Sequence, residues 1–129
     1  MLTEKDYCDY DTCVALKELG YIGSPHECEC YGAYFNFGND IFTDSLDNTE
    51  VGTNEFLRVP LYLAHKWLRE KKNIQIEMPI SFMDNGVWKF SFRIQTSKFY
   101  DRAIGEWDSY EEALSEGIKE AIKILKEEK

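Results

Sequence analysis

Two stretches in which apolar and polar residues strictly alternate lie on either side of an Asp-Asn-Gly sequence, and they constrain the fold of this chain most. The apolar positions are Ile74, Ile76, Met78, Ile80 and Phe82 in the first stretch and Trp88, Phe90, Phe92 and Ile94 in the second. Alternation with a period of two is typical of a strand with one buried and one solvated face. Two such strands joined by a short turn predict an antiparallel hairpin.

The register of this hairpin depends on the length of its turn. A two-residue turn at Asn85 and Gly86 would place the two apolar sets on opposite faces. A three-residue turn pairs Phe82 with Trp88 and leaves both apolar sets on one face. We therefore expect the longer turn, with Gly86 in the left-handed region of a G1 bulge. Pro79 removes one ladder donor, which predicts an edge strand or a bulge at that position.

Burial of the apolar face leads to two further expectations. Trp88 is expected to be buried opposite Phe82, under the Gly117 region of the last helix, so that Trp88→Ala would cost about 3–5 kcal/mol of stability. The opposite face of the hairpin is expected to carry a polar set of side chains, namely Lys89, Ser91, Arg93 and Gln95.

The clearest helix is the last element of the chain. Its apolar residues follow the spacing i, i+3, i+4, i+7 and are Tyr110, Ala113, Leu114, Gly117, Ile118, Ala121, Ile122 and Leu125. This spacing predicts one stripe that faces the core. Ser109 and Glu112 form a capping box at its start. Gly117 interrupts a row of larger side chains, which indicates a close approach to a bulky strand residue.

Two further helices are predicted upstream. One begins at Pro60, because the fixed φ of proline suits the first helical position, and ends near Asn73. Its buried stripe is expected to contain Leu61, Ala64, Trp67 and Leu68. The other lies between an N-cap at Asp9 and a left-handed cap at Gly20. Its inward-facing residues are expected to be Ala15, Leu16 and Leu19.

The remaining segments complete an α+β prediction. A strand is expected at 27–37, a long polar loop at 38–58, and another loop at 97–108 to which a short strand could be added. The order is helix, strand, helix, strand, strand, helix. Helices on one face of a small antiparallel sheet of three or four strands make a two-layer α+β fold. With 129 residues, the whole range 1–129 is expected to form a single domain.

The distribution of charge bears on the class of partner. The formal net charge is −9, with −10 in residues 1–56, +5 in 57–102 and −4 in 103–129. An acidic chain without a membrane-length apolar run or a signal peptide is expected to be cytoplasmic and not to bind nucleic acid or membranes. The basic residues Lys66, Arg69, Lys71 and Lys72 are interpreted as the solvated face and last turn of a helix.

Candidate metal ligands are Cys8, Cys13, His26, Cys28 and Cys30. Zinc would accept such ligands, but the Cys-x-x-Cys spacing of zinc knuckles is missing. Buried free thiols are therefore favoured over a zinc site or disulfides.

Nucleophilic catalysis would have to use His26 or His65. Neither a nucleophile-elbow sequence nor a phosphate-binding glycine loop accompanies them. Two further acidic sets are interpreted as solvated: Glu27 with Glu29, and Asp40, Asp44, Asp47 and Glu50, which lack a calcium-binding pattern. No catalytic residue and no cofactor is predicted.

Aromatic residues exceed what one small core needs. The chain has eight Tyr, eight Phe and three Trp. The surplus consists of Tyr7, Tyr10, Tyr31, Tyr34, Phe35, Tyr62 and Tyr100. Tyrosine is favoured at interfaces, so this surplus indicates a protein partner or a homo-oligomer.

Three sequence runs carry a resemblance to known proteins: Tyr7-Cys8-Asp9-Tyr10, Ala64-His65-Lys66-Trp67-Leu68-Arg69-Glu70 and Asp108-Ser109-Tyr110-Glu111-Glu112-Ala113-Leu114. In this order they resemble a family of small uncharacterised proteins from prophages and mobile elements of gut-dwelling anaerobic bacteria. The resemblance covers most of the chain except 38–58. It implies a mobile-element accessory protein and assigns no functional residue.

The sequence thus favours a non-enzymatic, acidic accessory protein that acts by protein–protein binding. One alternative is a metal-dependent or catalytic site built from the Cys and His residues. A second alternative is nucleic-acid binding through the basic middle segment, with Lys89 and Arg93.

Overall fold

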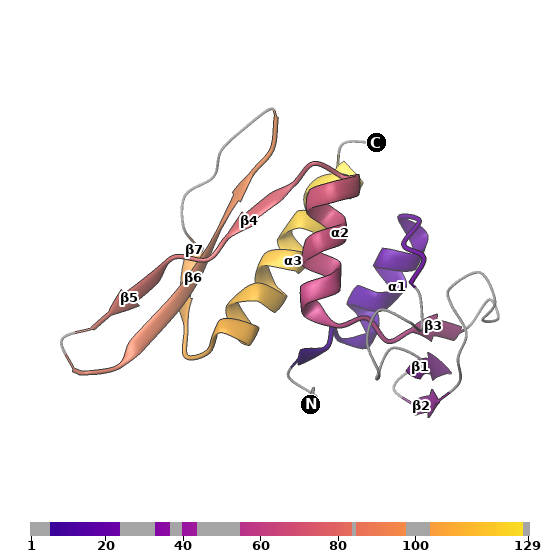
Figure 1. Cartoon of the computed structure of the whole chain (residues 1–129), viewed down its shortest axis with the longest axis horizontal. Helices are drawn as coiled ribbons and strands as arrows, with labels where there is room; N and C mark the ends of the chain where they lie inside the picture. Colours follow the sequence, from indigo (N-terminus) through magenta and orange to yellow (C-terminus); the bar gives the residue numbers. More distant parts are fainter. Residues whose placement is uncertain are drawn as a thin grey trace. The chain divides into compact units, whose positions relative to one another are not determined.

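A computed structural model describes residues 6–23, 33–36, 40–43, 55–83, 85–97 and 104–127. The chain divides into two compact units, Met1–Pro60 and Leu61–Lys129. Three helices and a small antiparallel sheet of four strands confirm the predicted α+β class, and a second antiparallel sheet lies in the first unit. Figure 1 shows the elements of both units.

The first unit contains helix α1, Tyr10–Glu18. Asp9 is its N-cap as predicted, because its side chain accepts a hydrogen bond from the Thr12 amide at 2.9 Å. Of the residues expected to face inward, Ala15 and Leu16 are buried, whereas Leu19 is half-buried. Before α1, Tyr7 forms an isolated antiparallel β-bridge with Pro60, the last residue of the unit. The Cys8 amide donates to the carbonyl oxygen of Val59 at 2.8 Å.

Three strands form the sheet of the first unit: β1 (Ala33–Asn36), β2 (Asp40–Thr43) and β3 (Glu55–Leu57). Their order is β2-β1-β3, and both pairs are antiparallel. Within the strand expected at 27–37, residues 33–36 form β1, and the others lie outside the described residues. The polar loop expected at 38–58 was wrong for 40–43 and 55–57. These segments contain the apolar pairs Ile41-Phe42 and Phe56-Leu57 within a mainly polar stretch, and both pair with β1.

The second unit begins with helix α2, Leu61–Lys71, one residue after the predicted start. Its predicted stripe is buried at Leu61, Ala64 and Leu68, and Trp67 is half-buried. The helix ends at Lys71, near the predicted end, and Asn73 just beyond it has a left-handed φ of +57°. The Ile74 amide then donates back to the carbonyl oxygen of Leu68 at 3.1 Å, so one of the last carbonyl groups of the helix is satisfied.

Four strands follow in this unit: β4 (Gln75–Glu77), β5 (Ile80–Phe82), β6 (Trp88–Gln95) and β7 (Ile104–Trp107). The long strand β6 pairs with β4 and β5 along one edge and with β7 along the other. The predicted register is confirmed, with Ile76 opposite Ile94 and Phe82 opposite Trp88. The predicted interruption is also present, since neither Met78 nor Pro79 belongs to a strand.

Helix α3, Tyr110–Glu127, packs on this sheet and also contacts α2. Ser109 caps it as predicted, accepting from the Glu112 amide at 3.1 Å. The expected close approach at Gly117 is confirmed, because a Cβ added there would lie 3.1 Å from Ile76 and 3.3 Å from Phe92. The core beneath the helix contains Ile74, Ile76, Phe92, Ile94, Leu114 and Ile118.

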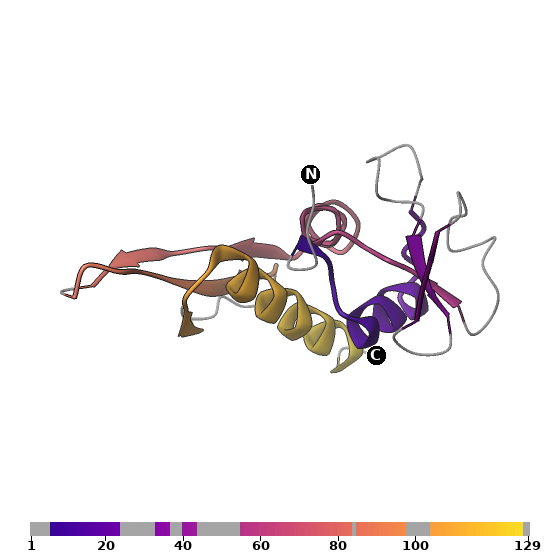
Figure 2. The same cartoon turned by 90° about the horizontal axis from the view of Figure 1, so that it is seen from below.

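The predicted burial of Trp88 was wrong, although its pairing with Phe82 was right. Trp88 is 57% exposed and Phe82 is 55% exposed. The β5–β6 hairpin extends beyond the first turn of α3 in both views (Figures 1 and 2), so the helix covers only the part of the sheet that contains Ile76 and Phe92. Tyr110, expected to face the core, is likewise exposed.

The turn of this hairpin depends on Gly86, which has a φ of +85° as predicted. Its amide donates to the carbonyl oxygen of Met83 at 2.9 Å. Gly86→Val is expected to lower the free energy of unfolding by about 1 kcal/mol or more, because a β-branched side chain resists positive φ. Urea unfolding followed by circular dichroism measures the change. A Gly86→Val variant as stable as the wild type would contradict the left-handed turn.

Candidate functional site

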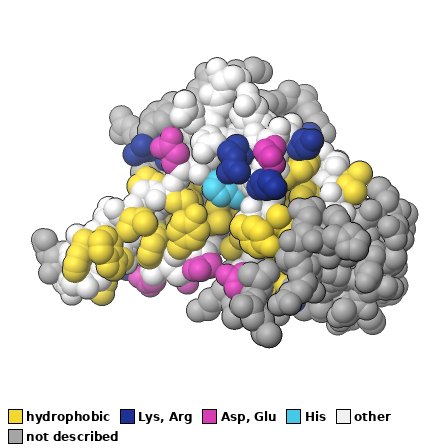
Figure 3. Space-filling model, viewed as in Figure 1, with side chains coloured by type: hydrophobic (Ala, Val, Ile, Leu, Met, Phe, Trp, Pro, Cys, Tyr) yellow, Lys and Arg dark blue, Asp and Glu magenta, His cyan; other side chains and the backbone are white. Residues whose placement is uncertain are grey.

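The outer part of the β5–β6 hairpin exposes four large apolar side chains, which we call the hairpin surface. They are Ile80 (53% exposed), Phe82 (55%), Val87 (43%) and Trp88 (57%). The Phe82 and Trp88 rings stack across the two strands, with centroids 4.8 Å apart and planes at 24°. Figure 3 shows hydrophobic side chains gathered along the hairpin. Adjacent exposed apolar groups of this kind mark interaction sites more often than scattered single ones do.

Burial along β6 shows where the core ends. Ile94 and Phe92 are buried, Phe90 is half-buried, and Trp88 at the start of the strand is exposed. Tyr110, the first residue of α3, packs edge-on against Phe90 with ring centroids 6.3 Å apart. The hairpin surface therefore begins where the cover provided by α3 ends.

The backbone of β5 adds hydrogen-bonding groups to this surface. The Ser91 amide donates to the Pro79 carbonyl oxygen at 3.0 Å, and the Met83 amide donates to the Val87 carbonyl oxygen at 2.8 Å. Since inward and outward residues alternate in an antiparallel pair, the N–H and C=O groups of Ile80 and Phe82 point away from β6. In the described part of the chain, no strand pairs with this outer edge of β5.

The outer edge of β4 is covered by a side chain instead. By the same alternation the carbonyl of Ile76 points away from β6. Nε2 of His65, on α2, lies 3.0 Å from that oxygen, so Nε2 carries the proton and donates to it. His65 is half-buried in this position.

The environment of His65 favours its neutral form. Burial lowers the pKa of His65 most; the hydrogen bond to Ile76 opposes this effect, and the charge of Arg69 adds to the lowering. The folded protein therefore binds this proton less readily than the unfolded chain, whose His pKa is about 6.5.

We expect the stability that neutral His65 contributes to be fully present above about pH 6.5, the pKa of His in the unfolded chain. This contribution is lost as the pH falls through the lower pKa of folded His65. Melting temperatures at about pH 7.5 and pH 5.5 should differ more for the wild type than for His65→Gln. Because His26 is present in both proteins, its titration cancels in the comparison. An equal decrease in the two proteins would show that His65 does not contribute.

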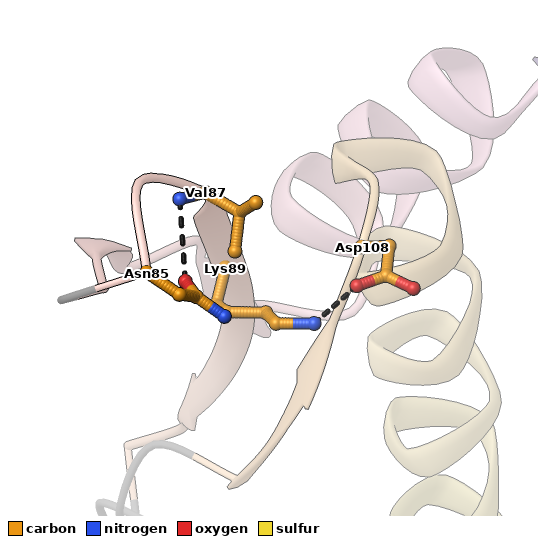
Figure 4. A network of polar contacts seen from close by, with 4 residues as sticks. All are labelled: Asn85, Val87, Lys89 and Asp108. Atoms are coloured by element: carbon orange, nitrogen blue, oxygen red, sulfur yellow. Dashed lines mark hydrogen bonds and ion pairs between the residues drawn. The ribbon is translucent and has the colours of Figure 1, made fainter.

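Charged groups at the base of the hairpin are mostly acidic. Lys89 donates a hydrogen bond to Asp108, which follows β7, as Figure 4 shows. This bond is the main cause that raises the pKa of Lys89, and the charges of Asp108 and Glu106 add to it. Glu111 and Glu112 lie in the first turn of α3. Four carboxylates thus lie in this region with one ammonium group.

Three of the cations considered for nucleic-acid binding have acidic neighbours. Lys89 pairs with Asp108, and Arg93 lies 3.2 Å from the carboxylate of Glu77. Lys66 lies 4.0 Å from Glu70 on the exposed face of α2. These pairings reduce the positive charge that a phosphate backbone would meet.

The predicted metal and catalytic candidates are only partly described. Cys8 and Cys13 are buried free thiols in the first unit, as expected of core cysteines. His26, Cys28 and Cys30 lie outside the described residues, as do Glu27, Glu29, Asp44, Asp47 and Glu50. Within the described ranges, no group of three or more His, Cys, Asp or Glu could hold a metal ion. The zinc alternative therefore stays a prediction.

The described members of the tyrosine surplus do not belong to the hairpin surface. Tyr7 is buried, Tyr10 packs against Phe56, and Tyr62 is exposed on α2. Tyr31, Tyr100 and the side chains of Tyr34 and Phe35 lie outside the described residues.

Sequence reasoning missed the hairpin surface because it assigned Trp88, Phe82 and Ile80 to the core. The Ser109 cap does indicate where α3 begins along the chain. Where that start lies along β6, however, depends on the β6–β7 pairing, in which Phe90 lies opposite Trp107.

Comparisons with protein-family models, with curated proteins and with solved structures found no match to this chain. None of the helices in the described part has the length and apolar character of a membrane-spanning segment.

Proposed function

We propose that this chain is a non-enzymatic, acidic accessory protein of a mobile element and that it acts by binding another protein through the hairpin surface. The observation that carries the proposal is the exposure of Ile80, Phe82, Val87 and Trp88 on one hairpin. The sequence resemblance described above supports the mobile-element setting.

The composition of the hairpin surface suits protein recognition. Tryptophan and phenylalanine supply large, rigid contact areas, and Trp is enriched among the residues that dominate binding energy. Because Phe82 and Trp88 already stack on each other, little side-chain freedom remains to be lost on binding. The outward N–H and C=O groups of β5 supply polar contacts beside the apolar ones.

Affinity purification from the native cell, at about 150 mM salt, tests the proposal. We expect the wild type to enrich a protein that the double variant Phe82→Ser/Trp88→Ser does not retain. Ile22→Ser is the matched control, because Ile22 is 57% exposed but belongs to the first unit. Far-ultraviolet circular dichroism shows whether each variant is folded.

The result for the three proteins decides whether the hairpin surface binds the partner. Loss of the bound protein from the folded double variant, with retention by the Ile22→Ser protein, supports binding through the hairpin surface. Equal retention by all three proteins would contradict it, as would the absence of any enriched protein.

A further inference from the structure

We infer that the partner contributes an extended segment with apolar side chains at alternate positions, which adds as a strand to the outer edge of β5. This inference rests on the proposed function, because it specifies how the hairpin surface binds and what chemistry the partner presents. Three observations carry it: the direction of the β5 backbone groups, the state of the other sheet edges, and the exposed apolar side chains of Ile80 and Phe82.

The β5 backbone is arranged to receive a strand. Ile80 and Phe82 each direct one donor and one acceptor away from β6, as the bonds of Pro79 and Met83 to that strand show. An added strand would bond to these groups. Its alternate side chains would lie on the same face as Ile80 and Phe82 and extend the apolar surface.

The other edges of the sheet are less suited to strand addition. The β4 edge is blocked where His65 bonds to the carbonyl of Ile76. β7 is irregular, because its register shifts opposite Phe90 and Phe92 and Gly105 has a φ of +69°. A bulged strand with left-handed backbone is a poor template for a regular ladder. Within this sheet, β5 is therefore the regular strand whose outer edge pairs with no described strand.

The side chains along β5 do not oppose pairing. Exposed edge strands are commonly protected by lysine or another charge, yet the segment Met78–Met83 contains no charged residue. Proline at position 79 precedes the pairing residues and leaves the outward groups of Ile80 and Phe82 in place.

Apolar contact identifies the kind of segment. Ile80 and Phe82 are 53% and 55% exposed on one face of β5. Glu106 and Asp108 lie on the β7 side of β6, opposite the β5 edge, so their charge does not select the segment. A segment with apolar residues at alternate positions would continue the surface of Ile80 and Phe82.

The probe for this inference is a nine-residue peptide of alternating valine and lysine, blocked at both ends, whose affinity is measured by fluorescence anisotropy. Ile80→Pro removes an outward amide without removing a bond to β6, whereas Ile80→Thr keeps the amide and the β-branched shape. We expect Ile80→Pro to bind about tenfold or more weaker than Ile80→Thr. Phe82→Pro and Phe82→Thr provide a second pair if Ile80→Pro does not fold.

Amide hydrogen exchange gives an independent readout on the wild type. The peptide should slow exchange at Ile80 and Phe82, whereas the amide of Ser81, which points toward β6, should change little. Equal affinities within both Pro/Thr pairs, or unchanged exchange at Ile80 and Phe82, would overturn strand addition.

A composition series tests the apolar character. A peptide of alternating serine and lysine should bind about tenfold or more weaker than the valine–lysine peptide. Equal binding of the two peptides, or no binding of the valine–lysine peptide, would overturn the inference.

Binding of the native partner distinguishes failure of strand addition from failure of the proposed function. If the partner is lost from Phe82→Ser/Trp88→Ser but binds Ile80→Pro and Ile80→Thr equally, the hairpin surface binds without strand addition. If it is retained by all of these variants, the proposed function itself is wrong.

Discussion

Ile118→Ala is expected to lower the free energy of unfolding by about 2–5 kcal/mol, whereas Trp88→Ala should lower it by about 1 kcal/mol or less. Ile118 is completely buried under the sheet, so its truncation leaves a cavity. Trp88 is larger but 57% exposed, and its described ring contact is the stack with Phe82. This expectation replaces the cost of about 3–5 kcal/mol that a buried Trp88 would have had.

Urea unfolding followed by far-ultraviolet circular dichroism measures both changes without relying on the fluorescence of the deleted tryptophan. Similar slopes for the two variants would show that the extent of unfolding is unchanged. A larger loss for Trp88→Ala than for Ile118→Ala would show that the hairpin surface is part of the core. The proposed function would then lose its supporting observation.

Gly105→Ala is expected to lower the free energy of unfolding by about 2 kcal/mol or more. Two effects combine at this position in β7. The backbone has a φ of +69°, and an added Cβ would overlap the six-membered ring of Trp107. That ring is stacked on Phe92 with centroids 5.5 Å apart, so it cannot move without disturbing the sheet.

Gly86→Ala is the matched control for this variant. Gly86 has a similarly positive φ of +85°, but nothing lies within 4 Å of the Cβ that would be added. Gly86→Ala should therefore lower the free energy of unfolding by only about 1 kcal/mol, which is the cost of a left-handed backbone for alanine. The difference between the two variants in urea measures the overlap with Trp107. Equal losses would mean that the tryptophan ring adjusts freely.

Local patterns predicted the hairpin and the starts of two helices well. Alternation of apolar residues predicted the pairing of Phe82 with Trp88, because a one-residue slip would separate the two apolar sets. The capping residues Asp9 and Ser109 predicted the starts of two helices, since each side chain accepts from an amide three residues later. These signals succeed because the interacting groups are close in sequence.

Polar composition misled the prediction for 38–58. Asp40–Thr43 and Glu55–Leu57 are strands because they pair with β1, and such pairing depends on residues distant in sequence. Strand preference reflects packing and pairing context more than intrinsic backbone preference. A short strand within a mainly polar stretch therefore resembles a loop when its sequence is read alone.

The candidate site depended still more on distant contacts. Alternation shows that Trp88 shares a face with Phe92, but it cannot show how far along that face a helix extends. The helix start at Tyr110 lies beside Phe90, and this position follows from the pairing of Phe90 with Trp107. Similarly, no pattern around His65 predicts its bond to the carbonyl of Ile76, eleven residues away.

The sequence by itself determined the α+β class, the hairpin register and the caps of the helices, because periodicity and capping act between near neighbours. The tertiary structure alone decided which part of the apolar face is covered and which sheet edge is blocked. Both depend on where α3 and α2 lie against the sheet. Burial is a property of the packed elements, so a side chain of core type such as Trp88 becomes surface wherever the neighbouring helix ends.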